Sequence, residues 1–312
     1  MVTIFLDAER FLDEAVQSVF AQTYPRWELL LVDDGSKDSS PGMARRYAEQ
    51  YPGSVRYLQH PGHDNRGTGA SRQLGIDQAA GEYIAFLDAD DLYLPEKLEC
   101  QVAVLEEHRT AGMVFGPTPH WHGWTGLPED IALDSVRRLG VPAEMLIQPP
   151  RLVEEFLARR ADTPATCGVL VRRSAIDAVG GFDTRFVDLF EDQAFFYQVC
   201  LAVPVYVQGR AHDRYRRHAR SMTTVRAARG DYADDYRPNR ARGAFLIWLD
   251  GYFREQGITD RRLRALLRRE LWPYRHPRLY RAARMGRAAL RRVLPVGWRR
   301  ALQGFAERLI RR

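Results

Sequence analysis

The sequence has little of several features that define large classes of proteins. Only three cysteines, Cys100, Cys167 and Cys200, occur in 312 residues, and they are far apart. They indicate buried thiols in a reducing compartment rather than a disulfide framework or a zinc site. No apolar run approaches the ~18 to 20 residues that cross a membrane. No basic flank, apolar run and small-residue cleavage site follow one another at the N-terminus, so we expect no signal peptide and a cytoplasmic protein.

Two common nucleotide-binding motifs are also missing. No Gly-x-x-x-x-Gly-Lys-Ser/Thr segment occurs, and Arg72 takes the place of the third glycine in the nearest dinucleotide fingerprint, which starts at Gly67. These absences argue against a P-loop NTPase and against a nicotinamide dehydrogenase. Arg66 and Arg72 are still candidates to face phosphate groups, with solvated helix arginines as the alternative.

The composition is that of a globular protein, but its charge is unevenly distributed. Hydrophobic residues make up 45% and charged residues 28% of the chain, which is ordinary for a folded domain. Residues 261–312 contain 17 arginines, no lysine and two glutamates, a net charge of +15, whereas the rest of the chain carries −9. We therefore expect the tail to meet something anionic: a phospholipid surface, nucleic acid or an acidic partner.

Strand and helix patterns alternate through the first 115 residues. Apolar strand-like runs occur at 2–6, 27–32, 55–58, 83–87 and 113–115. Helical spacing occurs between them, at 9–22, 41–51, 68–80 and 95–108. Such alternation predicts an α/β fold with a mostly parallel central sheet flanked by helices.

The rest of the chain is less regular. Residues 117–150 have no clean period, strands are expected at 166–171 and 203–207, and helices at 174–179 and 191–201. From residue 241 onward the pattern is helical, interrupted by Pro273, Pro277 and Pro295. We divide the chain into a nucleotide-binding half (1–116), an acceptor-binding and catalytic half (117–225) and a helical, arginine-rich extension (226–312).

An acidic cluster, Asp88-Ala89-Asp90-Asp91, directly follows the apolar run 83–87. Parallel α/β sheets bind ligands at the carboxyl ends of their strands, so three carboxylates here indicate a ligand site. Carboxylate oxygens suit Mg²⁺ or Mn²⁺, which would bridge two phosphate oxygens and neutralise a diphosphate leaving group. The alternative is a turn and helix cap ahead of Pro95.

Two other acidic pairs occur at element ends. Asp33-Asp34 follows the run 27–32, so it is expected on the same edge of the sheet, where a carboxylate can accept a hydrogen bond from a base or ribose. A plain turn is the alternative. Glu191-Asp192 opens a helical run and suits either a general base or acids placed favourably at a helix N-terminus.

Two further segments are candidates for ligand contacts. Residues 215–218, Tyr-Arg-Arg-His, follow the last expected strand as a basic loop able to close over a diphosphate. His218 is a candidate metal ligand there, with simple exposure as the alternative. Trp121 lies in an aromatic stretch, and aromatic faces suit a sugar or a lipid-linked acceptor. A small satellite core is the alternative.

Several ordered segments together resemble the family 2 glycosyltransferases, which have the GT-A fold. The matching stretches are "FLDAERFLDEAVQSVFAQTYPRWELLLVDDGSKDSS", "GASRQLGIDQAAGEYIAFLDADDLYLPEKLE" and "GVLVRRSAIDAVGGFDTRF…EDQAFF". They span about residues 1–201, and the chain after roughly residue 225 has no counterpart in the family pattern. The resemblance implies inverting, metal-assisted transfer of a sugar from a nucleotide-diphosphate sugar, a UDP-sugar as first choice, in cell-surface glycan synthesis.

The resemblance also implies roles for individual residues. Asp7 and Asp34 would bind the nucleotide, with Asp34 at the base. Asp88 would hold the ribose or diphosphate side, and Asp90 would ligate Mn²⁺ or Mg²⁺. Asp192 would be the catalytic base, with Glu191 as the fallback. Gly181 and Phe182 would line the acceptor side. One departure is that Leu6 precedes Asp7, where the family usually has a tyrosine that can stack on the base.

Two rival functions come from other classes. A nucleotidyltransferase would normally carry a Gly- and Lys-rich loop near its N-terminus, and this chain has only Lys37 and Lys97. Nucleic-acid binding through the tail would be weak and salt-dependent, and we expect no specific nucleic acid.

The tail itself contains two apolar stripes backed by arginines. Such helices can lie in an anionic membrane interface at the inner face of the membrane or pack on the enzyme body. The first stripe is Leu263, Leu266, Leu267 and Leu271, and the second is Trp298, Ala301, Leu302, Phe305 and Leu309.

Overall fold

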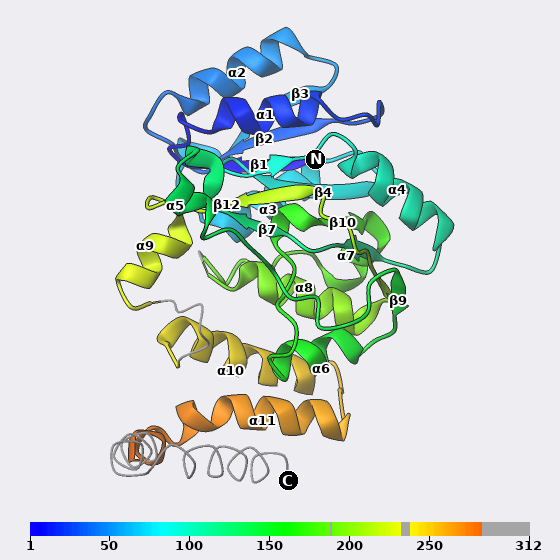
Figure 1. Cartoon of the computed structure of the whole chain (residues 1–312), viewed down its shortest axis with the longest axis vertical. Coiled ribbons are helices and arrows are strands. Elements are labelled where there is room, and N and C mark those ends of the chain that lie inside the picture. The colour runs from blue at the N-terminus through cyan, green and yellow to red at the C-terminus, as the bar shows by residue number, and fades with distance from the viewer. Residues whose placement is uncertain (188, 232–237, 283–312) are drawn as a thin grey trace.

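The computed structural model describes residues 1–187, 189–231 and 238–282. Its centre is a sheet of eight strands (Figure 1). Their order is β3 (Val55–Gln59), β2 (Leu29–Asp33), β1 (Val2–Phe5), β4 (Tyr83–Asp88), β10 (Val169–Arg172), β6 (Met113–Phe115), β11 (Val205–Val207) and β9 (Met145–Ile147). Strands β1 to β4 are parallel, β10 is antiparallel to β4 and β6, and β9 is antiparallel to β11. The predicted α/β fold is confirmed, and its sheet is mixed.

A smaller sheet lies beside the end of β4. Its order is β5 (Leu92–Tyr93), β12 (Asp213–Arg216), β7 (Pro119–Trp121) and β8 (Ser135–Val136). Tyr215 and Arg216 therefore belong to a strand, although the sequence predicted a loop there. Strands of two to four residues are too short to show a period. Through β7 and β8, this sheet joins the irregular segment 117–150 to β12, which pairs with the β5 strand that follows Asp91.

Alternation along the strands gives the large sheet two apolar faces. Leu29 and Leu31 point to one core and Leu30 and Val32 to the other, and all four are 0% exposed. Helices α1 (Leu12–Phe20), α2 (Ser40–Gln50) and α4 (Lys97–Glu107) cover the first face. Helices α3 (Thr68–Gln78), α6 (Arg151–Leu157), α7 (Arg173–Val179) and α8 (Glu191–Ala202) cover the second.

Shorter helices complete the connections. They are α5 (Pro128–Ile131) in the irregular segment and α9 (Met222–Ala228) after β12. Single turns of 3₁₀ helix occur at Pro61–His63, Gly123–Thr125 and Thr166–Gly168.

The first part of the arginine-rich extension packs on the body of the protein. Helices α10 (Arg240–Glu255) and α11 (Arg261–Arg275) stack beside α6 and α8 (Figure 1). The leucine stripe of α11 is buried: Leu263, Leu267 and Leu271 are 0%, 1% and 0% exposed. A stripe buried in this way is not available to a membrane, so the packing alternative is the correct one for this helix. Helix α11 also runs through Pro273 to Arg275 instead of breaking at that proline.

Ion pairs accompany this packing. The Glu270 carboxylate is buried and accepts hydrogen bonds from Arg159 at 2.7 Å and from Arg242 at 2.8 Å. Arg262 pairs with Glu154 at 3.2 Å. Part of the basic charge therefore balances acids of the body. The second predicted stripe, from Trp298 to Leu309, lies outside the described residues. Within the described ranges, no helix is long and apolar enough to cross a bilayer.

Candidate active site

The carboxyl end of β4 carries two accessible carboxylates. The side chains of Asp88 and Asp90 are 24% and 31% exposed. Asp91 is different: it is 1% exposed, and its Oδ1 accepts a hydrogen bond from the backbone N–H of Arg216 at 2.8 Å. Of the three acids that the sequence grouped as one ligand set, two lie at the edge of the sheet, and the third holds β12 from inside.

A buried arginine joins Asp88 to the acidic pair on α8. Arg72, on α3, is 3% exposed. Its Nη2 donates to Asp88 Oδ1 and its Nη1 donates to Glu191 Oε1, both at 2.7 Å. Glu191 also accepts from the Thr68 hydroxyl at 2.7 Å. The two carboxylates come from different halves of the chain, so this arginine holds the two halves of the site together.

The packing around Arg72 explains why α3 begins with glycines. Gly67 has φ +85°, and a Cβ there would lie 2.2 Å from the Val187 carbonyl oxygen. At Gly69, a Cβ would lie 3.1 Å from the Phe186 carbonyl oxygen. The absence of side chains lets α3 approach the segment before α8 closely enough for Arg72 to reach Glu191.

Asp192 is the half-buried neighbour of Glu191 in the first turn of α8. Burial raises the pKa of Asp192 to about 7, with the charge of Glu191 adding to the effect and Arg72 opposing it. A carboxyl group that titrates near neutral pH can accept a proton and release it under working conditions. The two acids therefore have different surroundings: Glu191 is held by Arg72 and Thr68, whereas burial is the dominant influence on the pKa of Asp192.

The loops after β1 and β2 interlock at the same edge of the sheet. Asp34 is 5% exposed, and its Oδ1 accepts from the amides of Arg66 and Gly67 at 2.7 and 3.1 Å. Asp7 Oδ1 accepts from the Lys37 amide at 2.7 Å. Leu6, at the position where the family has a stacking tyrosine, is 47% exposed. Both aspartates therefore shape loops in addition to any contact with a nucleotide.

The segment after β12 returns to Asp90. His218 Nε2 lies 2.9 Å from Asp90 Oδ2. Arg216 is 3% exposed, and it donates to the Asp90 carbonyl at 2.7 Å and to Glu14 at 2.6 Å. Its guanidinium also lies over the ring of Trp121 at 4.7 Å. Arg216 thus fixes the turn that carries Asp90, and His218 is the imidazole that reaches the carboxylate.

The residue types at this edge of the sheet fit a hard divalent cation. Asp88 and Asp90 offer carboxylate oxygens, which suit Mn²⁺ or Mg²⁺, and His218 adds an imidazole beside Asp90. Burial raises the pKa of Asp88, Arg72 opposes this and the charge of Asp90 adds to it. Within the described residues these three do not form a group whose ligand atoms all lie within 4.8 Å, because Asp88 is turned toward Arg72. Of the three, Asp90 and His218 lie in direct contact, 2.9 Å apart.

The residues predicted for the acceptor lie in different surroundings. Phe182 is 4% exposed and stacks on Phe195 with ring centroids 4.4 Å apart. A Cβ on Gly181 would lie 2.1 Å from Gln73 Oε1. The Arg72 guanidinium lies 5.7 Å from the centre of the Phe182 ring. Trp121 is half-buried against Arg216.

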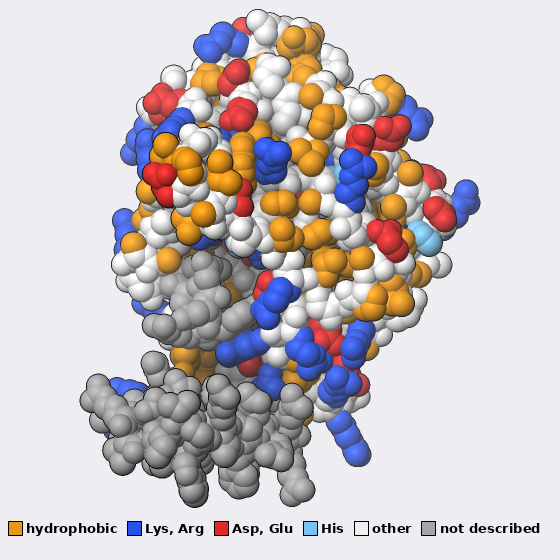
Figure 2. All heavy atoms as spheres, in the orientation of Figure 1, with side chains coloured by type: hydrophobic (Ala, Val, Ile, Leu, Met, Phe, Trp, Pro, Cys, Tyr) orange, Lys and Arg blue, Asp and Glu red, His pale blue; other side chains and the backbone are white. Residues whose placement is uncertain are grey.

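A basic cavity opens beside His218. It has a volume of about 540 Å³, and its lining includes Arg10, Trp124, Arg217 and Arg220. Next to it, the segment 117–150 exposes hydrophobic side chains that gather over α5 (Figure 2). Leu127, Ile131, Leu133 and Val136 are 49%, 53%, 57% and 59% exposed. A second cavity, of about 570 Å³, lies at the opposite ends of the strands beside Met1 and Trp27, and its lining includes none of these residues.

The sequence did not predict the positions of two residues that support the site, Arg216 and Glu14. Arg216 was expected in a loop above the diphosphate, and its buried position under Asp90 depends on pairing between short strands. Glu14 was seen only as a residue of the first helix, and no signal in its neighbourhood linked it to Arg216. The aromatic residues at 121–124 and the Tyr-Arg pair at 215–216 are the trace that this cluster leaves in the sequence.

Two curated relatives of the chain are both named as glycosyltransferases. The chain is 41% identical over 103 residues to the putative glycosyltransferase EpsE of Bacillus subtilis, a match covering 33% of this chain and 36% of that protein. It is 32% identical over 112 residues to the putative teichuronic acid biosynthesis glycosyltransferase TuaG of the same organism, covering 36% and 43%. The chain thus spans well under two thirds of these curated relatives.

Solved structures share the fold at low sequence identity. The S. aureus TarS 1-349 complex with UDP-GlcNAc superimposes with a TM-score of 0.60 at 18% identity, covering 86% of this chain and 69% of that one. The mannosyltransferase PcManGT from Pyrobaculum calidifontis, in complex with GDP-Man and Mn²⁺, gives 0.60 at 17% identity, covering 99% and 79%. The expected GT-A fold is confirmed by these neighbours. The family described as glycosyl transferase family 2 matches residues 1–179. Since this match covers more than half of the chain and includes Arg72, Asp88 and Asp90, the chain belongs to glycosyl transferase family 2.

Proposed function

We propose that this protein transfers a sugar from a nucleotide-diphosphate sugar to a hydroxyl acceptor with inversion at the anomeric carbon. The observation that carries the proposal is that Arg72 donates both to Asp88, at the carboxyl end of β4, and to Glu191, in the first turn of α8. The TarS and PcManGT complexes hold UDP-GlcNAc and GDP-Man. They support a nucleotide-sugar donor, and a UDP-sugar is our first choice.

In this mechanism Asp192 is the base. Its carboxylate takes the proton of the acceptor hydroxyl, whose oxygen attacks the anomeric carbon as the bond to the nucleoside diphosphate breaks. Attack from the face opposite the leaving group inverts the configuration. Glu191 is the fallback base, but it already accepts hydrogen bonds from Arg72 and Thr68. We therefore assign Glu191 and Arg72 to positioning and Asp192 to proton transfer.

We place the donor along the carboxyl ends of β1, β2 and β4. Asp34 would define the base pocket through the turn at Arg66 and Gly67, and Asp7 would support it from the first loop. Asp88 would meet the ribose or the diphosphate. A divalent ion, Mn²⁺ or Mg²⁺, would be held by Asp90 with His218 and would neutralise charge on the diphosphate. The PcManGT complex contains Mn²⁺.

We propose a lipid-linked or glycan acceptor in cell-surface polysaccharide synthesis. The exposed hydrophobic side chains over α5 and the arginines of the neighbouring cavity match an amphiphilic, anionic acceptor better than a neutral soluble sugar. The name of the TuaG relative points in the same direction. Trp121, Gly181 and Phe182 would then support the walls of the acceptor side.

The experiment that tests the proposal is a donor screen. Purified protein is incubated with UDP- and GDP-sugars with Mn²⁺, Mg²⁺ or EDTA, and thermal stabilisation and donor hydrolysis are measured. We expect one donor to stabilise the protein and to be hydrolysed only with metal. Asp192→Asn should bind that donor and turn it over slowly. If no nucleotide sugar stabilises the protein under any metal condition, the proposed function is wrong.

We also propose that the last part of the extension binds an anionic membrane surface. Residues 283–312 hold nine arginines and one glutamate, and each basic residue near an anionic leaflet is worth ~1 kcal/mol. Co-sedimentation with liposomes, comparing the full chain with one ending at Arg284, tests this. We expect only the full chain to prefer anionic over neutral lipid, and equal binding by both would contradict the idea.

A further inference from the structure

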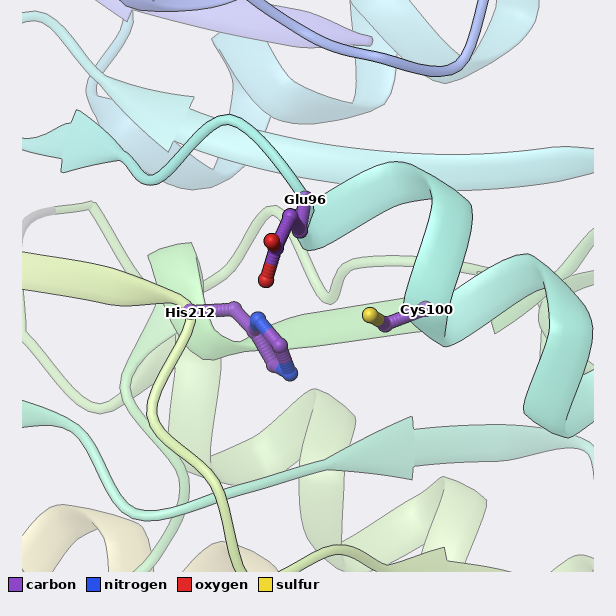
Figure 3. Close-up of side chains that lie close together, drawn as sticks. All are labelled: Glu96, Cys100 and His212. Carbon is purple, nitrogen blue, oxygen red and sulfur yellow. The ribbon is translucent and has the colours of Figure 1, made fainter.

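Three side chains of types that can ligate a metal meet where the beginning of α4 lies against the beginning of β12. They are Glu96, which precedes the first turn of α4, Cys100, one helical turn further on, and His212, just before β12. Their ligand atoms all lie within 4.8 Å of one another. Figure 3 shows the carboxylate, the thiol and the imidazole pointing into a common space.

Backbone pairing fixes where these side chains stand. Residues 96 and 100 are separated by four positions, so they share one face of α4. Strand β12 pairs antiparallel with β5, with Asp213 opposite Tyr93. The Leu94 amide donates to the His212 carbonyl at 2.8 Å. His212 is therefore held against the beginning of α4 by the small sheet, and the cluster does not depend on a loose loop.

Within the described residues, the ring nitrogens of His212 have no hydrogen-bond partner. His212 is 4% exposed, and a buried polar group is normally hydrogen-bonded. In the described part of the chain no hydrogen bond or ion pair to its ring nitrogens occurs. An imidazole that is buried, unpartnered and directed at a carboxylate and a thiol has the surroundings of a metal ligand rather than of a core histidine.

We propose that Glu96, Cys100 and His212 bind a zinc ion, with the fourth position open to water. Thiolate sulfur, imidazole nitrogen and carboxylate oxygen are the three ligand types of tetrahedral Zn²⁺ sites, and softness of the thiolate disfavours Mg²⁺ and Mn²⁺. The Cys100 thiol gives its proton to solvent as the zinc–sulfur bond forms. The sequence pointed away from a zinc site because the third ligand is 112 positions beyond Cys100.

The geometry requires only a small adjustment. Zinc–ligand bonds of ~2.0–2.3 Å place ligand atoms within about 4 Å of one another, and these three already lie within 4.8 Å of one another. Glu96 is the partner able to move, because its side chain is 47% exposed. Arg210 pairs with Glu96 Oε2 at 2.8 Å, which leaves the second carboxylate oxygen for the metal. Bound zinc would tie α4, which follows Asp90 and Asp91, to the strand that carries Arg216.

The test uses the full chain stripped of metal and zinc alone as the ligand. We expect one zinc ion per chain by native mass spectrometry, tight enough to survive buffer exchange. Cobalt in its place should give the absorption of a tetrahedral thiolate complex. Cys100 is half-exposed while Cys167 and Cys200 are buried, so zinc should block alkylation of Cys100, which peptide mapping reads directly.

Substitutions distinguish zinc binding at this site from metal binding at the acidic end of β4. Cys100→Ser should abolish the thiolate absorption, and Glu96→Gln should weaken zinc binding at least tenfold. Glu107→Gln, an exposed carboxylate on the same helix, and Asp90→Asn should leave zinc stoichiometry and the cobalt spectrum unchanged. Circular dichroism checks that each variant is folded. Full zinc binding by Cys100→Ser, or no binding by the unaltered chain at micromolar zinc, overturns the proposal.

Discussion

Replacing Arg72 by methionine isolates the charge that joins the two halves of the site. The substitution keeps most of the apolar stem and removes hydrogen bonds at 2.7 Å to Asp88 and to Glu191. The carboxylate of Glu191 is then left buried without its cation, since its side chain is only 5% exposed. Breaking a buried ion pair from one side costs about 3–5 kcal/mol. We therefore expect the free energy of unfolding to fall by about that amount at pH 8.

The loss of stability in Arg72→Met should depend on pH. Burial already raises the pKa of Asp88, and Arg72 opposes that rise, so removing Arg72 raises it further above the value in the unfolded chain. The folded variant then binds a proton more tightly than the unfolded one, and its stability is lost as pH rises through the folded pKa. The penalty of Arg72→Met should accordingly be smaller at pH 5 than at pH 8.

Urea denaturation followed by tryptophan fluorescence at both pH values measures this, with Arg66→Met as the matched control. Arg66 precedes α3 and is exposed, so its loss should change stability by less than about 0.5 kcal/mol. If the free energy of unfolding of Arg72→Met at pH 8 is less than about 1 kcal/mol below that of the unaltered protein, Arg72 does not compensate buried charge.

Three other predictions concern the base, the metal and the extension. Asp192→Asn should lower kcat by ~10² to 10⁴ with donor affinity unchanged. The kcat/KM of the unaltered protein should rise with pH to a plateau above about 7, where Asp192 is ionised. Steady-state kinetics from pH 5.5 to 9 checks both, and a product of retained configuration would exclude inversion. Asp90→Asn should keep the melting temperature but abolish Mn²⁺-dependent donor hydrolysis, and near-normal turnover with Mn²⁺ would remove Asp90 from the metal site. Leu267→Ala should cost about 2–5 kcal/mol because the side chain is 1% exposed, and an unchanged urea midpoint would mean that α11 is not part of the core.

The sequence was most informative where local pattern and topology coincide. Apolar runs such as 83–87 identified the buried strands, and the acids that follow them marked the edge of the sheet where ligands bind. Long-range partners left no such pattern. Nothing near Arg72 indicates that Glu191, 119 positions away, supplies half of its counter-charge. Asp90 and Asp91 are neighbours in the chain, but only the fold determines that one is accessible and the other buried.

In the extension, one sequence pattern is compatible with two different environments. A leucine stripe with arginines on the other faces suits a membrane interface and a protein groove equally well. The outcome for α11 depended on acids elsewhere in the chain, at Glu154 and Asp250, which pair with its arginines. Composition of the helix alone carried no information about those partners.

The burial of α11 changes where the smallest independently folding unit of this enzyme ends. The family match stops at residue 179, and a chain cut there would lose α8, α10 and α11, which share a core with α6. A chain cut at 225 would keep α6 and α8 but expose the apolar surfaces that α10 and α11 cover. Arg159 would lose its contact with Glu270 as well. We expect such fragments to aggregate and a chain reaching Arg275 to stay soluble. Work that isolates the family 2 core by sequence homology alone would therefore remove part of its hydrophobic centre.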